Sequence, residues 1–444
     1  MRKLLTLLLI SYTMFASAQT GSFPIDGKTI SYTSASVVTN TVKYSDGTVL
    51  TITGSVAKSV VTKAYKDYLL SHPTWILVGT GSGRLDLGVL ANKKFKIKPG
   101  NYWSIGFTSA TNVVIDATGV TINSDYSSFD INNANNFELY GLTMADQSYR
   151  AVNIRGFCTG IYLHDLTFKN IKSNVITYEY AGIWDGTDKT NSKDWRIENC
   201  SFTNVGQGIG LGGGYSDGGI TTYMSGIKIL NNKFVDCPTI GTVMYASALD
   251  GYEIAGNVVN NINNVYDKSA PNGIHNGIFM ITGNGSFHDN KITNHQGNAI
   301  RAWGVSFGST VKDIKIYNNI VYNSWKYSAF ELQAPQHIVD FLTSHKGVIN
   351  YTDAYVYNNT AGHLTISKDW EGVMLDTYNT GGKISYYNNF GFDMYRPANA
   401  IGNMTNSNGG NIVKDSGNLY LNTWQEAVTD LTTFKSKFVG VGAQ

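Results

Sequence analysis

The sequence predicts a right-handed parallel β-helix, a fold in which short strands wind in coils around one core. Three observations support this prediction. A short phrase recurs from the first third of the chain to its end, successive copies lie 24 to 40 residues apart, and the segments between them alternate over short runs broken by Asn and Gly. Repeats of about 20 to 50 residues are typical of stacked architectures. Helical repeats would need longer segments with a period of about 3.6 residues, and these segments lack them.

The recurring phrase is an apolar residue, a variable residue, two small polar residues, another variable residue and a second apolar residue. Residues 229–234, 316–321 and 356–361 are the clearest copies, and Asn-Asn forms the centre of each. The remaining copies vary this form and lie at residues 139–144, 163–168, 197–202, 254–259, 287–292, 386–391 and 415–420. Each copy is interpreted as one sharp turn between two strands of a coil.

Asn residues at these turns have a structural explanation. Asn tolerates the left-handed backbone conformation that a sharp turn requires. Asn side chains stacked from coil to coil can also form hydrogen bonds along the axis of the stack. We therefore expect one ladder, in which Cys200 occupies the same slot on an earlier coil. The expected ladder consists of Asn232, Asn257, Asn290, Asn319, Asn359, Asn389 and Asn418.

Both ends of the repeat region are predicted to be capped, because a solenoid must protect its open edges. Residues 55–71 and 422–438 place apolar side chains at helical spacing, and the insertion at 333–350 predicts a short helix that protrudes from one coil. The expected organisation is a signal peptide at 1–18, an N-terminal strand and helix cap at 19–89, the β-helix at 90–421 and a C-terminal cap at 422–444.

Residues 1–18 have the pattern of a secretion signal. Arg2 and Lys3 precede an apolar run, and an A-x-A cleavage site lies at residues 16–18. No later stretch approaches the roughly 18 apolar residues that cross a bilayer as a helix. The chain has 34 Lys+Arg and 32 Asp+Glu, a net charge of +2 that falls to zero without Arg2 and Lys3. We expect a secreted or periplasmic monomer with no membrane span and no nucleic-acid partner, since the basic field that nucleic acid requires is missing.

The cysteines do not form a recognisable functional motif. Cys158, Cys200 and Cys237 are odd in number, and their spacing matches no zinc or redox pattern. We expect buried free thiols that pack as small apolar side chains. A single disulfide between two of them is the alternative.

A second strand follows the turn in each coil, and its outward face is the candidate site. One residue per strand is expected to point inward: Ile183, Ile209, Val243, Ile278, Ile300, Phe330 and Val373. Alternate residues of a strand face opposite sides, so the residues that follow should form an outward stripe: Trp184, Gly210, Met244, Phe279, Arg301, Glu331 and Met374. The same face then adds Trp303, Gln333 and Asp376.

Aromatic side chains beside a few charges suit a sugar chain, whose ring faces are apolar and whose rims are polar. The expected substrate-binding residues are Trp184, Phe279, Trp303, Gln333 and His275. The alternative is that long loops cover this face and that these residues only pack beneath them.

The charged residues of the stripe suggest a chemistry. Arg301 could grip the carboxylate of a uronic acid or a sulfate as a two-pronged fork, or it could form a plain salt bridge to Glu331 on the next coil. Glu331 and Asp376 are expected on adjacent coils with an offset along the strand, roughly 6–9 Å apart, which suits an inverting glycosidase. His295, His275 and Lys326 lie close to the stripe in sequence and could act as bases, although turn or surface roles are open for each.

The repeat, the leader and an opening coil at residues 96–102 together resemble the secreted proteins of the pectate lyase-like superfamily. The resemblance covers roughly residues 90–420 and implies a right-handed parallel β-helix. Residues 283–304 are similar to the active coil of alginate and chondroitin lyases of this fold, where an Arg works with a Lys on the coil before. Arg301 matches the Arg, whereas the slot of the Lys falls near Gly283. The paired Asp motifs of polygalacturonases and the calcium-binding Asp set of pectate lyases are not visible.

These observations lead to the expectation of a secreted protein that cleaves a uronate-containing polysaccharide by β-elimination. Arg301 would neutralise the carboxylate, and His295 or Lys326 would take the proton. One alternative is a glycoside hydrolase that uses Glu331 and Asp376. Another is a carbohydrate-binding or surface β-helix without catalysis. No ligand cluster identifies a metal site, and Ca²⁺ remains a candidate cofactor.

Overall fold

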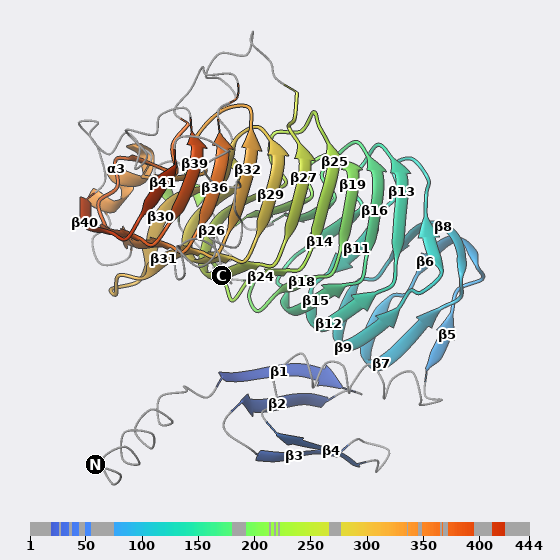
Figure 1. The fold of residues 1–444 in the computed structure, drawn as a ribbon. Helices are drawn as coiled ribbons and strands as arrows, with labels where there is room; N and C mark the ends of the chain where they lie inside the picture. The colour runs from blue at the N-terminus through green and yellow to red at the C-terminus, as the bar shows by residue number, and fades with distance from the viewer. Residues whose placement is uncertain are drawn as a thin grey trace.

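The computed structural model of the chain is a right-handed parallel β-helix, which confirms the predicted fold class (Figure 1). The structure describes residues 19–25, 28–34, 38–43, 49–54, 75–179, 192–212, 215–216, 219–220, 223–265, 277–334, 336–344, 349–364, 366, 372–394 and 411–421. Strands of successive coils pair in parallel, so the coils stack in chain order. The strands form three sheets along the stack, which we call sheets A, B and C, and some long strands pass from one sheet to the next.

Sheet A precedes the recurring turn. Its strands are β5 (Ile76–Val78), β7 (Val89–Ile97), β9 (Ser109–Asp116), β12 (Ala134–Tyr140), β15 (Thr159–His164), β18 (Arg196–Glu198), β24 (Lys228–Leu230), the later parts of β26 (Met244–Ala255) and β28 (Gly277–His288), β31 (Asp313–Tyr317), β35 (Asp353–Tyr357), β38 (Lys383–Tyr387) and β40 (Asn411–Ser416).

Sheet B follows the recurring turn. Its strands are the first part of β8 (Gly100–Gly106), β10 (Val120–Ile122), β13 (Thr143–Gln147), β16 (Thr167–Ile171), β19 (Ser201–Val205), β25 (Lys233–Cys237), β27 (Val258–Ile262), β29 (Lys291–His295), β32 (Ile320–Ser324), β36 (Thr360–Leu364), β39 (Phe390–Met394) and β41 (Leu419–Leu421).

Sheet C completes each coil and carries the candidate site. Its strands are β6 (Ser82–Asp86), the end of β8, β11 (Phe129–Asn132), β14 (Val152–Arg155), β17 (Ile176–Glu179), β20 (Ile209–Gly212), the first parts of β26 and β28, β30 (Asn298–Phe307), β33 (Phe330–Gln333) and β37 (Leu375–Tyr378).

The core lies inside the coils and is built from columns of apolar side chains. In sheet A one such column repeats at the same register position on nine successive coils. It consists of Leu139, Leu163, Ile197, Ile229, Ile254, Phe287, Ile316, Val356 and Tyr386, and all nine are fully buried. Burial of each such side chain contributes about 1.5–3 kcal/mol. The apolar residue that opens the recurring phrase on these nine coils thus forms this core column and stabilises the stack.

The predicted asparagine ladder is confirmed between sheets A and B. The side-chain oxygen of each Asn accepts hydrogen bonds from the coil before it, so that Asn319 accepts from the backbone and side-chain nitrogens of Asn290 at 3.1 Å each. Its side-chain nitrogen donates to Asn359 at 2.9 Å and to the carbonyl of Phe287 at 3.0 Å. At the first end of the ladder the amide of Cys200 donates to Asn232 at 2.9 Å.

The two polar residues of each phrase have different structural roles. The first residue adopts the left-handed conformation, with φ of 54° at Asn231 and Asn318 and 53° at Asn358. The second residue is buried and forms the ladder. Gly256 and Gly417 replace Asn at the first position, and both also have positive φ. The first position after sheet A therefore requires a residue that tolerates a positive φ. The second position, in the ladder, requires an amide side chain.

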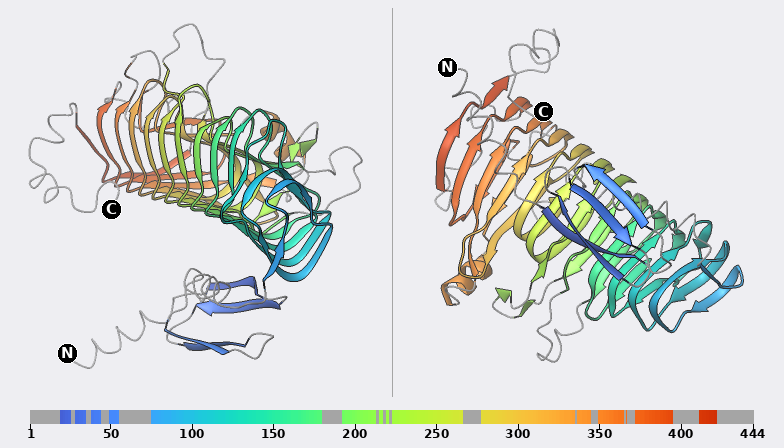
Figure 2. Two further views of the ribbon diagram at one scale, coloured as in Figure 1. Left: turned by 90° about the vertical axis from the view of Figure 1, so that its right-hand side faces the viewer. Right: turned by 90° about the horizontal axis from the view of Figure 1, so that it is seen from below.

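Only part of the organisation expected at the two ends of the chain lies within the described residues. Parallel pairing already joins β5 to β7, so the stack includes residues before the expected boundary at residue 90. The N-terminal strands form two antiparallel pairs, β1 (Gln19–Ile25) with β2 (Lys28–Ser34) and β3 (Val38–Lys43) with β4 (Val49–Gly54). These pairs lie outside the coil stack, with β1 against β9 and β12 (Figure 2). The expected leader and the expected helices at 55–71 and 422–438 lie outside the described residues.

The helix predicted in the 333–350 insertion is confirmed as α3 (Gln336–Ser344). It packs Ile338 and Leu342 against Val305 and Phe307 of β30. Strand β34 (Ile349–Tyr351) then returns antiparallel to β30. Three short strands complete the described elements: β21 (Tyr215–Ser216), β22 (Gly219–Ile220) and β23 (Met224–Ser225). Within the described ranges, no helical segment has the length and apolar character that a bilayer crossing demands.

All three cysteines are buried and free, as expected. Cys158 and Cys200 lie in the main core, and burial raises the pKa of the Cys200 thiol to about 12. A thiol that stays protonated in the core is a poor nucleophile and a poor metal ligand. The structural interpretation of the cysteines is confirmed.

Candidate functional site

The register of sheet C places three of the predicted charged residues in one outward column. Met280 pairs with Arg301, Arg301 with Glu331, and Glu331 with Asp376 on four successive coils. Asp376 therefore lies directly beside Glu331, without the offset along the strand that the sequence suggested. Coils are spaced by about 4.8 Å, so the backbones of the two residues lie about that far apart.

Two of the seven residues of the predicted outward stripe were wrong by one residue. Met244 and Phe279 pair with Ile209 and Ile300 in the inward column, and both are 0% exposed. Met374 is also fully buried. In these coils each of the three follows another apolar residue, Val243, Ile278 or Val373, so alternation alone could not tell which of the pair enters the core. Phe279 is therefore a core residue and not a substrate platform.

The true neighbours of Arg301 on the outer face are different. Tyr245 takes the position that Met244 was expected to hold, and its side chain is 40% exposed. Met280 takes the position expected for Phe279. Trp184 and His275, which were expected to bind substrate, lie outside the described residues. The outward column thus reads Gly210, Tyr245, Met280, Arg301, Glu331 and Asp376.

Arg301 is held by two side chains of the neighbouring coil. Its Nε lies 3.3 Å from Oε1 of Glu331, and its Nη2 donates to Oε1 of Gln333 at 3.1 Å. The Arg301 side chain is 16% exposed and that of Glu331 only 2%. The salt bridge that was one expectation for Arg301 is therefore present. The salt bridge and the hydrogen bond together orient the guanidinium on the outer face of sheet C.

A second outward row runs two residues further along the same strands. Trp303 pairs with Gln333, and Gln333 pairs with Tyr378, whose side chain is 44% exposed. The indole of Trp303 meets the ring of His337 edge to face, with centroids 5.7 Å apart. Helix α3 therefore borders this row on one side. Trp303 and Gln333 were predicted on this face, and the structure places both there.

His295 and Lys326, the two bases expected from sequence, are not on this face. His295 ends β29 of sheet B and points into the core between Ile262 and Ser324, with 0% exposure. Burial lowers its pKa to about 4, so it is neutral near pH 7. Asn294 before it has a φ of 53°, and this left-handed residue interrupts the alternation of the strand, so that the next side chain points inward. Lys326 is 2% exposed at the corner between β32 and β33.

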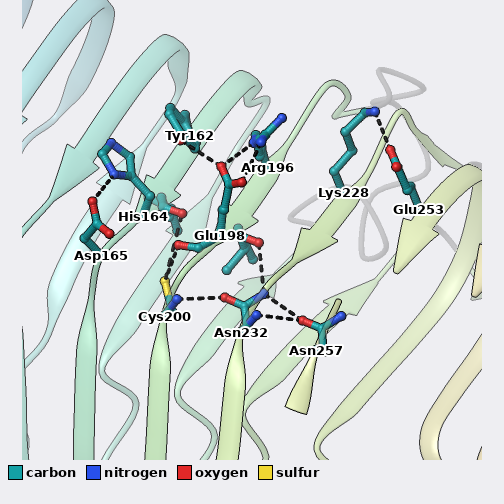
Figure 3. A network of polar contacts seen from close by, with 12 residues as sticks. Tyr162, His164, Asp165, Arg196, Glu198, Cys200, Lys228, Asn232, Glu253 and Asn257 are labelled. Carbon is teal, nitrogen blue, oxygen red and sulfur yellow. Dashed lines mark hydrogen bonds and ion pairs between the residues drawn. The ribbon is translucent and has the colours of Figure 1, made fainter. Parts of the chain in front are cut away.

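A second charged cluster, which sequence reasoning missed, lies on sheet A (Figure 3). His164 contacts Asp165 at 2.8 Å and Glu138 at 3.0 Å, and its ring stacks between Tyr140 and Tyr162. Arg196 donates two hydrogen bonds of 2.6 Å to Glu198, which also accepts one from Tyr162.

The charges of this sheet A cluster stabilise one another. Although burial opposes its charge, hydrogen bonds to Asp165 and Glu138 raise the pKa of His164. Although burial opposes the charge of Glu198 too, the hydrogen bonds from Arg196 lower its pKa. Each charged group has an opposite partner, so the cluster is best explained as structure. Across the described part of the chain, His, Cys, Asp and Glu do not gather in a group of three or more that could hold a metal ion.

Comparisons with known proteins give two distant likenesses. No protein-family model matches the sequence, and no curated protein matches it. The crystal structure of a hyperthermoactive exopolygalacturonase from Thermotoga maritima is 9% identical over 72% of this chain and 86% of that chain, with a TM-score of 0.35. The catalytic unit of a GH87 α-1,3-glucanase from Streptomyces thermodiastaticus strain HF3-3 is 14% identical over 82% of this chain and 66% of that chain, with a TM-score of 0.39. Likenesses of this size bear on neither the activity nor the substrate of this chain.

Proposed function

We propose that this protein is an exported enzyme of the pectate lyase-like type that cleaves an acidic polysaccharide by β-elimination on the outer face of sheet C. The observation that carries the proposal is the guanidinium of Arg301, which Glu331 and Gln333 hold in place. A planar fork fixed in this way is pre-organised to bind the carboxylate of a uronic acid. The exposed rings of Tyr245 and Tyr378 beside it provide apolar surface for sugar rings.

The reaction needs a neutralised carboxylate and a base. Arg301 would pair with the uronate carboxylate, which acidifies the C–H bond next to it. Asp376, half-buried beside Glu331 in the outward column, replaces His295 and Lys326 as the proposed base. Asp376 takes the proton from C5, the electron pair forms the C4–C5 double bond, and the bond from C4 to the glycosidic oxygen breaks. The departing oxygen takes a proton from water.

Glu331 is a positioning residue in this proposal. Its 2% exposed side chain makes it a poor contact for a substrate chain, and its oxygen points to Arg301. Removing it would leave the guanidinium charged but less well oriented. The effect on turnover should therefore be partial.

Glycoside hydrolysis by Glu331 and Asp376 is the second candidate. The observation in its favour is their direct pairing on adjacent strands. Strand spacing places the Cα atoms of such a pair roughly 5 Å apart, so both carboxyl groups could reach one glycosidic bond, as glycoside hydrolysis requires. In this alternative Glu331 would react with the substrate itself.

An assay with two readouts separates these candidates. Purified protein is incubated with polygalacturonate, alginate, chondroitin sulfate and hyaluronate, and with xylan and β-glucan as neutral controls. Ultraviolet absorbance measures the unsaturated sugar that elimination creates, and a reducing-end assay measures all cleavage. The proposal predicts equal amounts of both on at least one acidic polymer. Reducing ends without absorbance would favour hydrolysis, and binding without either product would favour a non-catalytic protein.

Export is a separate part of the proposal and rests on the pattern of residues 1–18. A secreted enzyme can meet polymers too large to enter a cell. Mass spectrometry of the exported protein should find Gln19 as its first residue. Retention of residues 1–18 would contradict the export pathway without affecting the assay above.

A further inference from the structure

An open cleft of about 360 Å³ lies at the N-terminal end of sheet C, far from Arg301. Its lining includes Arg84 and Asp86 of β6, Ser104 and Gly106 of β8, and Asp130 of β11. The volume falls within the range of about 300–1,000 Å³ that is typical of small-ligand sites. Six coil steps separate Asp130 from Arg301 in the outward column. At about 4.8 Å per coil, the two places are roughly 29 Å apart.

The floor of the cleft is a glycine between two carboxylates. Asp86 pairs with Gly106, and Gly106 pairs with Asp130, so the two Asp residues stand on the coils either side of it. A Cβ at Gly106 would lie 3.2 Å from the Cβ of Asp130. A side chain at this position would therefore fill the floor and press on Asp130. Glycine keeps the space between the carboxylates open.

The polar groups of the cleft are fixed by their own loops. Asp86 accepts a hydrogen bond from the amide of Gly88 at 3.0 Å, and Asp130 accepts one from the hydroxyl of Ser128 at 3.0 Å. Asn132 donates to the carbonyl of Phe107 at 2.8 Å. Each carboxylate has two oxygens and about four acceptor positions. The side-chain nitrogen of Asn153 also lies 3.3 Å from Oδ1 of Asp130, and both carboxylates keep acceptor positions that a ligand with hydroxyl groups could use.

Exposed aromatic rings lie along the corner where the first coils pass from sheet B to sheet C. Trp103, next to Ser104, is 54% exposed, Tyr126 is 77% exposed and Tyr149 is 40% exposed. The rings of Tyr126 and Tyr149 lie 6.3 Å apart at an angle of 37°, and the guanidinium of Arg150 lies 5.8 Å from the Tyr149 ring.

The backbone at Tyr126 adds a second sign of function. Its φ is 60°, a left-handed conformation that is unusual for a bulky side chain. Such a conformation costs on the order of 1–3 kcal/mol, and residues of this kind concentrate at ligand-binding sites. Here the strained residue displays its ring to solvent instead of packing it. Apolar burial in the described structure does not explain that arrangement.

We propose that this cleft binds a neutral sugar unit of an oligosaccharide. Asp86 and Asp130 accept hydrogen bonds from sugar hydroxyls, charge-assisted bonds that are stronger than neutral ones. Tyr126 and Tyr149 provide ring faces for the apolar face of a neighbouring sugar. The two carboxylates outnumber Arg84, so a uronate would be repelled and a neutral sugar preferred. This site is independent of the reaction proposed at Arg301.

Binding measurements on the full mature protein test the site. Isothermal titration would use the hexaoses of cellulose, xylan, laminarin and mannan, with hexagalacturonate as the acidic comparison. At least one neutral hexaose should bind. Asp130→Asn and Tyr126→Ala should each weaken that binding at least tenfold. Gly106→Ala should weaken it as well, because the new methyl group fills the floor.

Matched variants show whether the effect belongs to this cleft. Asp313→Asn and Tyr355→Ala change the same residue types on sheet A and should leave Kd unchanged, as should Arg301→Lys on the distant part of sheet C. Melting temperatures establish that each variant is folded. The site is overturned if no neutral hexaose binds, if Asp130→Asn weakens the binding of hexagalacturonate more than that of the neutral hexaose, or if Arg301→Lys abolishes binding of the neutral hexaose while Asp130→Asn does not.

Discussion

The asparagine ladder and the outer face of sheet C are built on the same coils but obey different rules. In the ladder, one buried position must pair with the coils on both sides, and an amide side chain does this on six successive coils, from Asn232 to Asn389. On sheet C the outward column changes from Gly210 to Tyr245, Met280, Arg301, Glu331 and Asp376. The comparison teaches that repetition marks structure in this protein, whereas departure from repetition marks a candidate site.

The largest effect should come from the proposed base on sheet C. Asp376→Asn keeps the size of the side chain and removes its ability to take a proton. Turnover of the acidic substrate should fall by about 10²- to 10⁴-fold. Initial rates of ultraviolet absorbance measure it, with Asp313→Asn on sheet A as the control that keeps full activity. Full activity in Asp376→Asn would remove Asp376 from the mechanism.

The buried partner of Arg301 should have a smaller effect. Glu331→Gln keeps a hydrogen-bond acceptor near Nε of Arg301 and loses the ion pair. We expect activity to fall by about tenfold, since the general acid–base contribution of about 10²- to 10⁴-fold is not touched. Glu198→Gln, which alters the Arg196 pair on sheet A, is the matched control. Near-complete loss in Glu331→Gln would instead favour hydrolysis with Glu331 in direct contact with substrate.

The two polar residues of the recurring turn should contribute differently to the free energy of unfolding. Asn319→Gly removes the hydrogen bonds to Asn290, Phe287 and Asn359 and leaves their buried partners unsatisfied. The free energy of unfolding should fall by about 1–3 kcal/mol more than in Asn318→Gly. Both variants carry the same cost for glycine in the unfolded chain, and Asn318 already has a φ of 54°. Urea unfolding of the two variants measures the difference, and equal losses would contradict the ladder.

The smallest effect is a pH dependence on sheet A. The folded-state pKa of His164 is raised above its unfolded value of about 6.5. Protonated His164 therefore stabilises the folded state below that unfolded value, and the contribution is lost as the pH rises through the folded pKa. His164→Phe should flatten this part of the stability curve, measured as the urea midpoint against pH. His337→Phe on α3 should keep it. An unchanged slope in His164→Phe would show that the charge on His164 does not contribute.

The fold could be predicted from the sequence because its repeat is local. Each phrase places two apolar residues at fixed spacing around a turn, and the core columns and the ladder follow from that spacing. The helix in the 333–350 insertion could be predicted for the same reason, since Ile338 and Leu342 lie one helical turn apart. The Asn ladder needed no knowledge of neighbouring coils beyond the repeat itself.

The site could be predicted only in part, because its phase depends on register. Arg301 and Glu331 directly follow the large apolar residues Ile300 and Phe330, and a charged residue at that position favours the phase that buries the apolar one. Phe279 follows Ile278, so either could enter the core. His295 was misplaced because the left-handed conformation of Asn294 interrupts the alternation of side chains along the strand.

The N-terminal cleft could not be predicted, because the recurring phrase begins at residue 139 and gives no register for earlier coils. Asp86, Gly106 and Asp130 are 20 and 24 residues apart in sequence, and only the strand pairing shows that they are neighbours. The sheet A cluster was missed for a related reason. Its charged partners come from different coils, and Glu138 lies outside the recurring phrases, so their spacing did not point to a contact with His164.

The most direct test of the account compares two arginines that both pair with a glutamate. Arg301→Lys and Arg196→Lys each keep the charge and lose the planar fork, on sheet C and on sheet A respectively. On the acidic polymer that the panel identifies, initial rates of ultraviolet absorbance should fall by at least 10²-fold in Arg301→Lys and stay near the parent rate in Arg196→Lys. Equal rates in the parent protein and Arg301→Lys would show that the active coil lies elsewhere.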